Sequence, residues 1–218
     1  MIKFIKRTVS CVFLLMVLLL PYTASAADEN LTAKQWFDKA KTYLQNKDES
    51  NAIIAYTKAI ALDPQYVSAY WDRGNIYHKQ GDYQLAIADY TKILQFDPYN
   101  PLIYENRGNS YRARGLYTQA IADYTRAIEI SPKASSPYYR RGSAYSYLSQ
   151  YELALADFDK VIELAPKGTS AYYARADALA SMGRIQEAID SFNAFIQFST
   201  PDDPWVEKAK QRIAQLSR

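Results

Sequence analysis

The sequence predicts an all-α fold, an α-solenoid in which pairs of helices stack one upon the next. One pattern returns every 34 residues, five times over, and is marked by evenly spaced prolines at Pro64, Pro98, Pro132 and Pro166. Within each copy, apolar residues recur at three- and four-residue steps, as on the buried side of a helix, and no stretch holds the alternation of a strand for long. A repeat of this length cannot bury its apolar face alone, so the copies must stack.

The first part of the chain has the features of a secretory signal peptide. Residues 1–7 carry three basic side chains and no acid, and residues 9–20 are almost wholly apolar. Ala24 and Ala26 supply the small side chains that a signal peptidase needs, so we expect cleavage after Ala26. The alternative is an uncleaved anchor, but a proline ends the apolar run short of the about 20 residues that span a membrane.

Cleavage would remove residues 1–26 and leave a short tail, 27–32, before the repeats. The chain has 26 basic and 23 acidic residues, and three of the basic ones lie in the signal peptide, so 23 of each remain. A mature protein without net charge gives no indication of nucleic-acid binding. The single cysteine, Cys11, also leaves with the signal, which excludes disulfides, a thiol nucleophile and thiolate metal sites.

Each copy predicts two helices joined by a tight turn. In the second copy, residues 67–80 and 84–96 have helical periodicity, and Gly81 between them tolerates the positive φ that ends a helix. In the first copy, Lys47, Asp48 and Glu49 replace this glycine turn. The predicted repeats are 33–66, 67–100, 101–134, 135–168 and 169–202, followed by a capping helix within 203–218.

The capping helix is predicted from its start signal and its apolar stripe. Asp203 followed by proline is a typical N-cap and first helical position. We expect one stripe to cover the last repeat while the other side of the helix meets water. The stripe consists of Trp205, Ala209, Ile213 and Leu216.

The repeat resembles the tetratricopeptide repeat (TPR) family. The residues that carry the resemblance in the second copy are Tyr70, Gly74, Tyr77, Ala86, Tyr90 and Pro98, and the third and fourth copies match in the same register. The resemblance implies a right-handed superhelix of helix-turn-helix units. It also implies that the first helix of each unit lines a concave groove that binds a protein or peptide.

Arginine stands before the repeat glycine, where the family usually has leucine, and aspartate follows sixteen residues later. We expect buried pairs, because an unpaired buried charge is expensive. Two schemes are open: pairing within a repeat leaves Arg175 facing Ser191 without a carboxylate, whereas pairing between repeats leaves Arg73 facing Ala55. A basic ladder for anionic ligands is the functional alternative. The side chains concerned are Arg73, Asp89, Arg107, Asp123, Arg141 and Asp157.

Positions 2, 5, 6, 9, 12 and 13 of each repeat face the groove in proteins of this family. Aromatic rings among amide and guanidinium donors suit a peptide ligand, although each ring can also be a partly shielded packing residue. The candidate groove residues are Phe37, Trp71, Asn75, His78, Lys79, Glu105, Asn106, Asn109, Arg112, Tyr139, Arg140, Ser143, Tyr173 and Asp177.

Some members of the family clamp a terminal carboxylate with lysine, asparagine and arginine side chains. Asn75, Asn106 and Arg140 match three of the five clamp positions. Trp71 and Ser136 replace the two lysines, so a clamp of that kind is not expected here.

The sequence favours a binding protein over an enzyme. His78 has no carboxylate motif beside it, and the chain has no phosphate loop or strained serine elbow, so we expect no catalytic residue, metal or cofactor. An undetected enzyme would have to use the carboxylates of Asp72, Glu105 and Asp177. We therefore expect an exported, periplasmic adaptor for a partner protein or peptide of the bacterial cell envelope. Structural self-association of the chain is the alternative.

Overall fold

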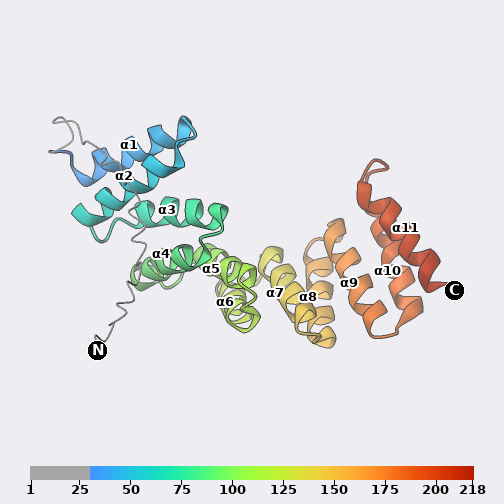
Figure 1. The fold of residues 1–218 in the computed structure, drawn as a ribbon. Coiled ribbons are helices and arrows are strands. Elements are labelled where there is room, and N and C mark those ends of the chain that lie inside the picture. The colour runs from blue at the N-terminus through green and yellow to red at the C-terminus, as the bar shows by residue number, and fades with distance from the viewer. Residues whose placement is uncertain (1–29) are drawn as a thin grey trace, which may run out of the picture. The chain divides into compact units, whose positions relative to one another are not determined.

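The computed structural model describes residues 30–218, and residues 32–218 form one compact unit (Figure 1). The predicted signal peptide and its cleavage site at Ala24 and Ala26 lie outside the described residues. Within the described part the regular elements are all helices, so the unit is all-α, as the periodicity predicts. In chain order they are α1 (Ala33–Gln45), α2 (Glu49–Leu62), α3 (Val67–Gln80), α4 (Tyr83–Phe96), α5 (Pro101–Ala113), α6 (Tyr117–Ile130), α7 (Ser135–Tyr147), α8 (Tyr151–Leu164), α9 (Thr169–Ser181), α10 (Ile185–Phe198) and α11 (Pro204–Leu216).

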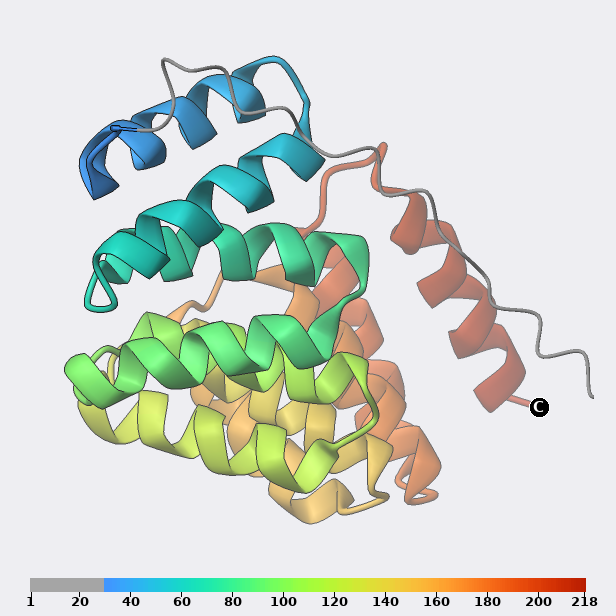
Figure 2. The same cartoon turned by 60° about the vertical axis from the view of Figure 1, so that its left-hand side comes forward.

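Each helix packs against the helix that follows it in the chain, which makes residues 32–218 an α-solenoid (Figures 1 and 2). The first helices of the repeats also approach one another, since α7 contacts both α5 and α9, and His78 of α3 contacts Ser110 of α5. They therefore share one side of the stack, which we call the A-helix face. The last helix, α11, packs beside α10.

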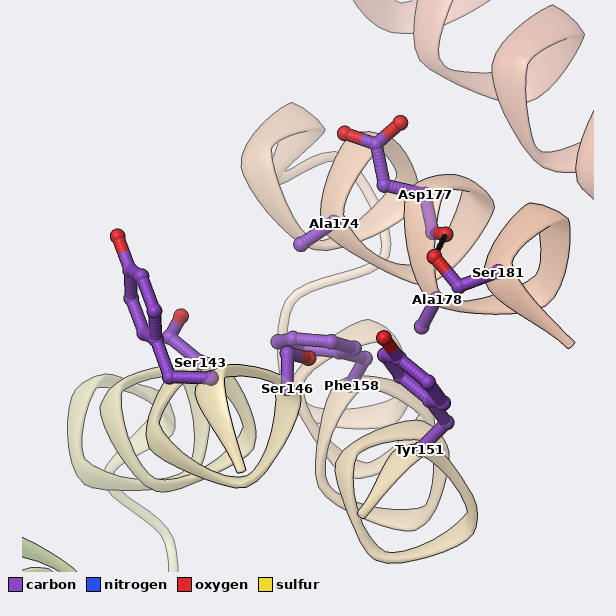
Figure 3. A pocket seen from close by; sticks show the side chains of 9 residues that line it. Ser143, Ser146, Tyr151, Phe158, Ala174, Asp177, Ala178 and Ser181 are labelled. Atoms are coloured by element: carbon purple, nitrogen blue, oxygen red, sulfur yellow. Dashed lines mark hydrogen bonds between the residues drawn. The ribbon is translucent and has the colours of Figure 1, made fainter. Parts of the chain in front are cut away.

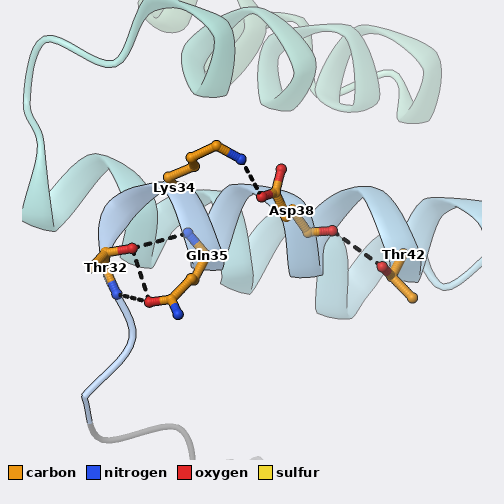
Figure 4. A network of polar contacts seen from close by, with 5 residues as sticks. All are labelled: Thr32, Lys34, Gln35, Asp38 and Thr42. Carbon is orange, nitrogen blue, oxygen red and sulfur yellow. Dashed lines mark hydrogen bonds and ion pairs between the residues drawn. The ribbon is translucent and has the colours of Figure 1, made fainter.

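Thr32 fixes the start of α1 through a reciprocal capping box (Figure 4). Its Oγ1 accepts a hydrogen bond from the Gln35 backbone N–H at 3.3 Å, and its own backbone N–H donates to Gln35 Oε1 at 2.8 Å. The box satisfies backbone donors that the first turn of a helix otherwise leaves without partners.

A left-handed residue ends the first helix of every repeat. Gly81 has φ of 87°, and Gly115 and Gly183 both have φ of 73°. Lys47 and Ser149 occupy the equivalent place in the first and fourth repeats with φ of 59° and 58°, although they carry side chains. The turn geometry therefore persists where the glycine is missing.

A second glycine position lets the two helices of one repeat approach closely. A Cβ placed on Gly108 would lie 2.7 Å from Cε1 of Tyr124, and one on Gly142 would lie 2.8 Å from Cε1 of Phe158. Such separations are far below van der Waals contact, so an aromatic ring occupies the space that a larger residue would fill. The glycine and the ring opposite it form the centre of each interior repeat.

Bidentate Arg–Asp pairs form within repeats two, three and four. Arg107 donates from Nε to Asp123 Oδ2 at 2.8 Å and from Nη2 to Asp123 Oδ1 at 2.7 Å. Its Nη1 donates to Thr91 Oγ1 of the preceding repeat at 3.1 Å. The pairs Arg73–Asp89 and Arg141–Asp157 repeat this arrangement. Each arginine thus joins its own two helices and also holds the repeat before it.

The expectation that Arg175 would lack a carboxylate is wrong. Its Nη1 donates to Ser191 Oγ, as the within-repeat scheme requires, but its Nε donates to Asp159 Oδ1 at 2.6 Å. Asp159 occupies the place in the fourth repeat that Thr57, Thr91 and Thr125 hold in the first three. Around Arg175, therefore, the carboxylate comes from the preceding repeat and the hydroxyl from its own repeat, the reverse of the arrangement around Arg107. The charge of Arg175 is still paired.

The predicted apolar stripe of α11 is wrong at its first member. Trp205 is 48% exposed, whereas Val206 is 9% exposed and Ala209 is fully buried. The Asp203 side chain accepts from the Trp205 backbone N–H at 2.9 Å, as expected for an N-cap, and this places Trp205 at the edge of the helix contact. None of the helices described here is long and apolar enough to cross a membrane.

Candidate functional site

Aromatic rings at the fifth position of the repeats are half-buried and pack against the core. Phe37 lies 5.5 Å from Tyr56 and 4.9 Å from Tyr66 between ring centroids. Trp71 packs against the buried cluster around Tyr90 and Ile93. These rings therefore stabilise the stack and show only part of their surface on the A-helix face.

Buried tyrosines hold the ninth-position amides of the second and third repeats. Tyr90 Oη donates to Asn75 Oδ1 at 2.7 Å, and Tyr124 Oη donates to Asn109 Oδ1 at 2.9 Å. The two amide oxygens are thus engaged inside the protein. In these repeats the ninth position supports the helix pair as well as lining the face.

The fourth and fifth repeats lack this tyrosine hydroxyl, because Phe158 and Phe192 take its place. Ser143, at the ninth position, donates instead to the carbonyl oxygen of Tyr139 at 2.8 Å. The carboxylate of Asp177, at the ninth position of the fifth repeat, accepts a hydrogen bond from Nη2 of Arg212, on α11, at 3.4 Å. The change from tyrosine to phenylalanine therefore frees the polar side chain of the ninth position at this end of the face.

Several candidate side chains in the middle of the A-helix face bind one another. Ser136 Oγ donates to Glu105 Oε2 at 2.6 Å, and Arg140 lies 3.4 Å from the same carboxylate oxygen. Arg140 Nη1 also donates to Asn109 Oδ1 at 3.0 Å. The backbone carbonyl oxygen of Asn106 accepts from Ser110 Oγ at 3.0 Å. This region is a connected polar network.

His78 belongs to the same region and is partly buried. Its Nδ1 lies 2.8 Å from Ser110 Oγ, and because that hydroxyl gives its proton to a backbone carbonyl, the histidine N–H is the donor. Burial lowers the pKa of His78, and the positive charges of Arg112 and Arg140 lower it further. Lys79, the next candidate, is exposed and forms an ion pair with Glu49 of the first repeat.

The three carboxylates considered for an enzyme lie on α3, α5 and α9, and each has a different partner. Tyr56 Oη donates to Asp72 at 3.1 Å, while Glu105 accepts from a serine and Asp177 is near Arg212. Among residues 30–218 no three His, Cys, Asp or Glu side chains are grouped to hold a metal ion.

Two adjacent pockets lie beside α7 and α9. The first also includes residues of α8, and the second also includes residues of α10 and of the start of α11. The first, which we call the serine pocket, has a volume of about 300 Å³ (Figure 3). It is lined by Ser143, Ser146, Tyr147, Tyr151, Phe158, Ala174, Asp177, Ala178 and Ser181. The second, the aromatic pocket, has a volume of about 570 Å³. It is lined by Tyr139, Tyr147, Thr169, Ser170, Tyr173, Ala174, Asp177, Phe195, Asp203 and Trp205.

Asp177 contributes to both pockets. In Figure 3 its carboxylate points away from Phe158 and Ser146, out of the serine pocket. Ser146 Oγ is buried and makes no hydrogen bond with any described residue. The serine pocket therefore contains a buried hydroxyl whose hydrogen-bonding capacity the protein itself does not use.

The rings of the aromatic pocket contact one another at well-defined angles. Tyr173 meets Trp205 edge to face at 5.1 Å between centroids, and meets Phe195 in the same way at 5.2 Å. Tyr147 stacks on Tyr117 at 4.9 Å with an angle of 9°, and it is still 63% exposed. Both Tyr147 and Trp205 thus present much of their ring surface to solvent beside the pocket.

Of the predicted site residues, the pockets bring together Tyr139, Ser143, Tyr173 and Asp177. Phe37, Trp71 and the polar residues of the second and third repeats lie outside them. The sequence analysis missed Tyr147, although it stands at the thirteenth position of its repeat and the position rule alone could have found it. Trp205 was assigned to the buried stripe, and no repeat position could have placed it here.

The fold and the pockets define a protein built to bind along one face of stacked helical repeats. A family model described as TPR repeat matches residues 40–81, 74–111 and 108–149, and one described as tetratricopeptide repeat matches residues 139–204. The chain belongs to the tetratricopeptide repeat family.

Solved structures of such proteins share the fold. A tetratricopeptide repeat protein from Parabacteroides merdae is 27% identical with a TM-score of 0.75, over 84% of this chain and 72% of that one. The MamA protein is 24% identical with a TM-score of 0.73, over 82% and 94% of the two chains. YrrB, described as a TPR protein with an unusual peptide-binding site, is 22% identical with a TM-score of 0.70, over 82% and 92%. No curated protein sequence matches significantly.

Proposed function

We propose that this protein is an exported adaptor that binds an extended segment of a partner protein along its A-helix face. The serine and aromatic pockets carry the proposal, because they are concave, adjacent and lined by partly exposed rings beside polar groups. Their volumes of about 300 and 570 Å³ lie near those of ligand sites in general. Exposed tyrosine and tryptophan are the side chains that most often dominate binding energy at interfaces.

Two further observations support binding of a peptide segment. TPR repeats in general serve protein interaction, and YrrB, a protein of the same fold, is described as having an unusual peptide-binding site. The pockets also follow the stacking direction from α7 through α9 to α11, so side chains several residues apart in an extended segment can reach them in turn.

The site of action in this proposal is the periplasm of the bacterial cell envelope. This part rests on the basic start, the short apolar run and the small residues of the first 26 positions. The mature protein should begin at Ala27 and lack Cys11. Intact mass of the protein from a periplasmic extract tests this, and a membrane-bound chain that keeps Met1 would contradict it.

The binding proposal is tested by capture from the envelope fraction with variants of the two exposed rings. Tyr147→Ala combined with Trp205→Ala should keep the wild-type helicity, because Tyr147 is 63% exposed and Trp205 is 48% exposed. The partner recovered with the wild type should be lost, since each hot-spot ring typically contributes about 2 kcal/mol or more to binding.

Tyr99→Ala is the matched control. Tyr99 is 74% exposed and lies outside both pockets, so its removal takes away a ring of the same kind from another surface. This variant should retain the partner. Equal recovery of the partner with the wild type and the double variant would mean that the pockets are not the binding site.

A further inference from the structure

The aromatic pocket combines rings with negative charge and contains no basic side chain in its lining. Five of its ten lining residues are aromatic, and two others, Asp177 and Asp203, are carboxylates. Asp203 is engaged as the N-cap of α11, whereas Asp177 has only a distant partner. Rings and a carboxylate around one space form an environment that favours a cation.

The charge of Asp177 is incompletely balanced by the protein. The Asp177 carboxylate lies 3.4 Å from Arg212 Nη2, whereas Asp123 lies 2.7 Å from Arg107 Nη2 in the buried pair. The side chains of Asp177 and Arg212 are both almost half exposed. Burial raises the pKa of the Asp177 carboxyl, and the charge of Arg212 opposes this only in part. A second cation at Asp177 would therefore be stabilised.

The rings of the pocket are accessible to such a cation. Lys208 Nζ lies 3.9 Å from the centroid of the Trp205 ring, which shows that an ammonium group already takes one side of this indole. Tyr147 has one face against Tyr117, and the rest of its exposed ring lines the pocket. Tyr173, on α9, meets the ring of Trp205 at the start of α11 in an edge-to-face contact.

The middle of the A-helix face carries two arginines, Arg112 and Arg140. Their positive charges lower the pKa of His78 further than burial alone does, and Arg140 also lies 3.4 Å from Glu105. A basic ligand side chain is repelled from that region and attracted to the acid-bearing pocket.

We propose that the aromatic pocket binds an arginine or lysine side chain of the partner segment, between its rings and the Asp177 carboxylate. This inference rests on the proposed function, because it assigns one residue class of the peptide that the face binds. The charge complementarity between the pocket and a basic side chain selects this occupant.

The test is selection of random twelve-residue peptides on the full chain, followed by binding of the synthetic peptides by fluorescence anisotropy. The selected peptides should share one basic residue. Replacing it with citrulline, which keeps the shape of arginine but has no charge, should weaken binding about tenfold, as expected for a desolvated charge contact. Peptides selected with lysine are tested with norleucine in the same way.

Asp177→Asn identifies the protein side of the contact. It should weaken the charged peptide about tenfold, and the citrulline peptide should bind the variant no worse than it binds the wild type, because the two changes remove one interaction. Asp190→Asn removes an exposed carboxylate on α10, outside the pocket, and should leave binding unchanged. Helicity and melting temperature confirm that both variants are folded.

The remaining outcomes separate the two proposals. If selected peptides depend on Tyr147 and Trp205 but tolerate citrulline, the basic-residue inference is wrong and the adaptor proposal stands. If no selected peptide depends on those two rings, both are wrong. If light scattering shows a dimer that Asp177→Asn abolishes, a second copy of the chain occupies the pocket and the inference is overturned.

Discussion

Replacing Arg107 with alanine is expected to lower the free energy of unfolding by about 3–5 kcal/mol, because it leaves a buried carboxylate without its counter-charge. Asp123 has a side chain only 6% exposed and receives two hydrogen bonds from this guanidinium. Burial disfavours the charge of Arg107, but the hydrogen bonds and field of Asp123 outweigh it and raise the arginine pKa. The same change also removes the hydrogen bond to Thr91 of the preceding repeat. Urea denaturation followed by circular dichroism measures the loss.

Arg126→Ala is the matched control for this experiment. Arg126 lies on α6 and pairs with Glu129 at the surface, where both side chains are about half exposed. Exposed pairs contribute about 0–1 kcal/mol, so the control should unfold near the wild-type midpoint. If Arg107→Ala loses no more stability than Arg126→Ala, the Arg107–Asp123 pair does not stabilise the protein as a buried ion pair would.

The helical pairs and their ion pairs could be predicted from the sequence because both repeat. A period of 34 residues fixes which residues share a position, and the constant separation of arginine and aspartate indicates a constant geometry. The exchange at Arg175 breaks that constancy. Asp159 is a carboxylate at a position that holds threonine in the first three repeats, and its partner belongs to the next repeat, so periodicity alone could not reveal the contact.

The candidate site was harder to predict because it depends on the exceptions to the repeat. Asp177 receives no hydrogen bond like those that Tyr90 and Tyr124 donate to their asparagines, because phenylalanine, Phe192, stands where those tyrosines do. Trp205 reaches the pocket because the start of α11 places its ring against Tyr173, and a helix that occurs once has no period from which to infer its orientation. Such departures from the common pattern therefore carry much of the information about function.

Replacing Gly108 with alanine is expected to destabilise the protein, although alanine is the better helix former by about 1 kcal/mol. The new Cβ would meet the Tyr124 ring at 2.7 Å, and that ring is fully buried and hydrogen-bonded to Asn109, so it has no free space to move into. Overpacking of this kind costs about 1–3 kcal/mol. Gly74→Ala should lose less, because its Cβ would lie 3.1 Å from the nearest ring atom. The midpoints of urea denaturation rank the two variants.

The ring opposite Gly108 is the proposed cause, and a double-mutant cycle isolates it. Tyr124→Leu alone should be destabilising, since it shortens a fully buried side chain and leaves Asn109 Oδ1 without its phenol donor. In that background Gly108→Ala should become neutral or stabilising, because the methyl group enters space that the ring has left while the helix gains alanine's propensity. A loss that is the same in both backgrounds would show that the cost of the Cβ comes from the helix itself. A change of sign would establish that the small residue is required by the close approach of α5 and α6, the packing on which each repeat of the solenoid is built.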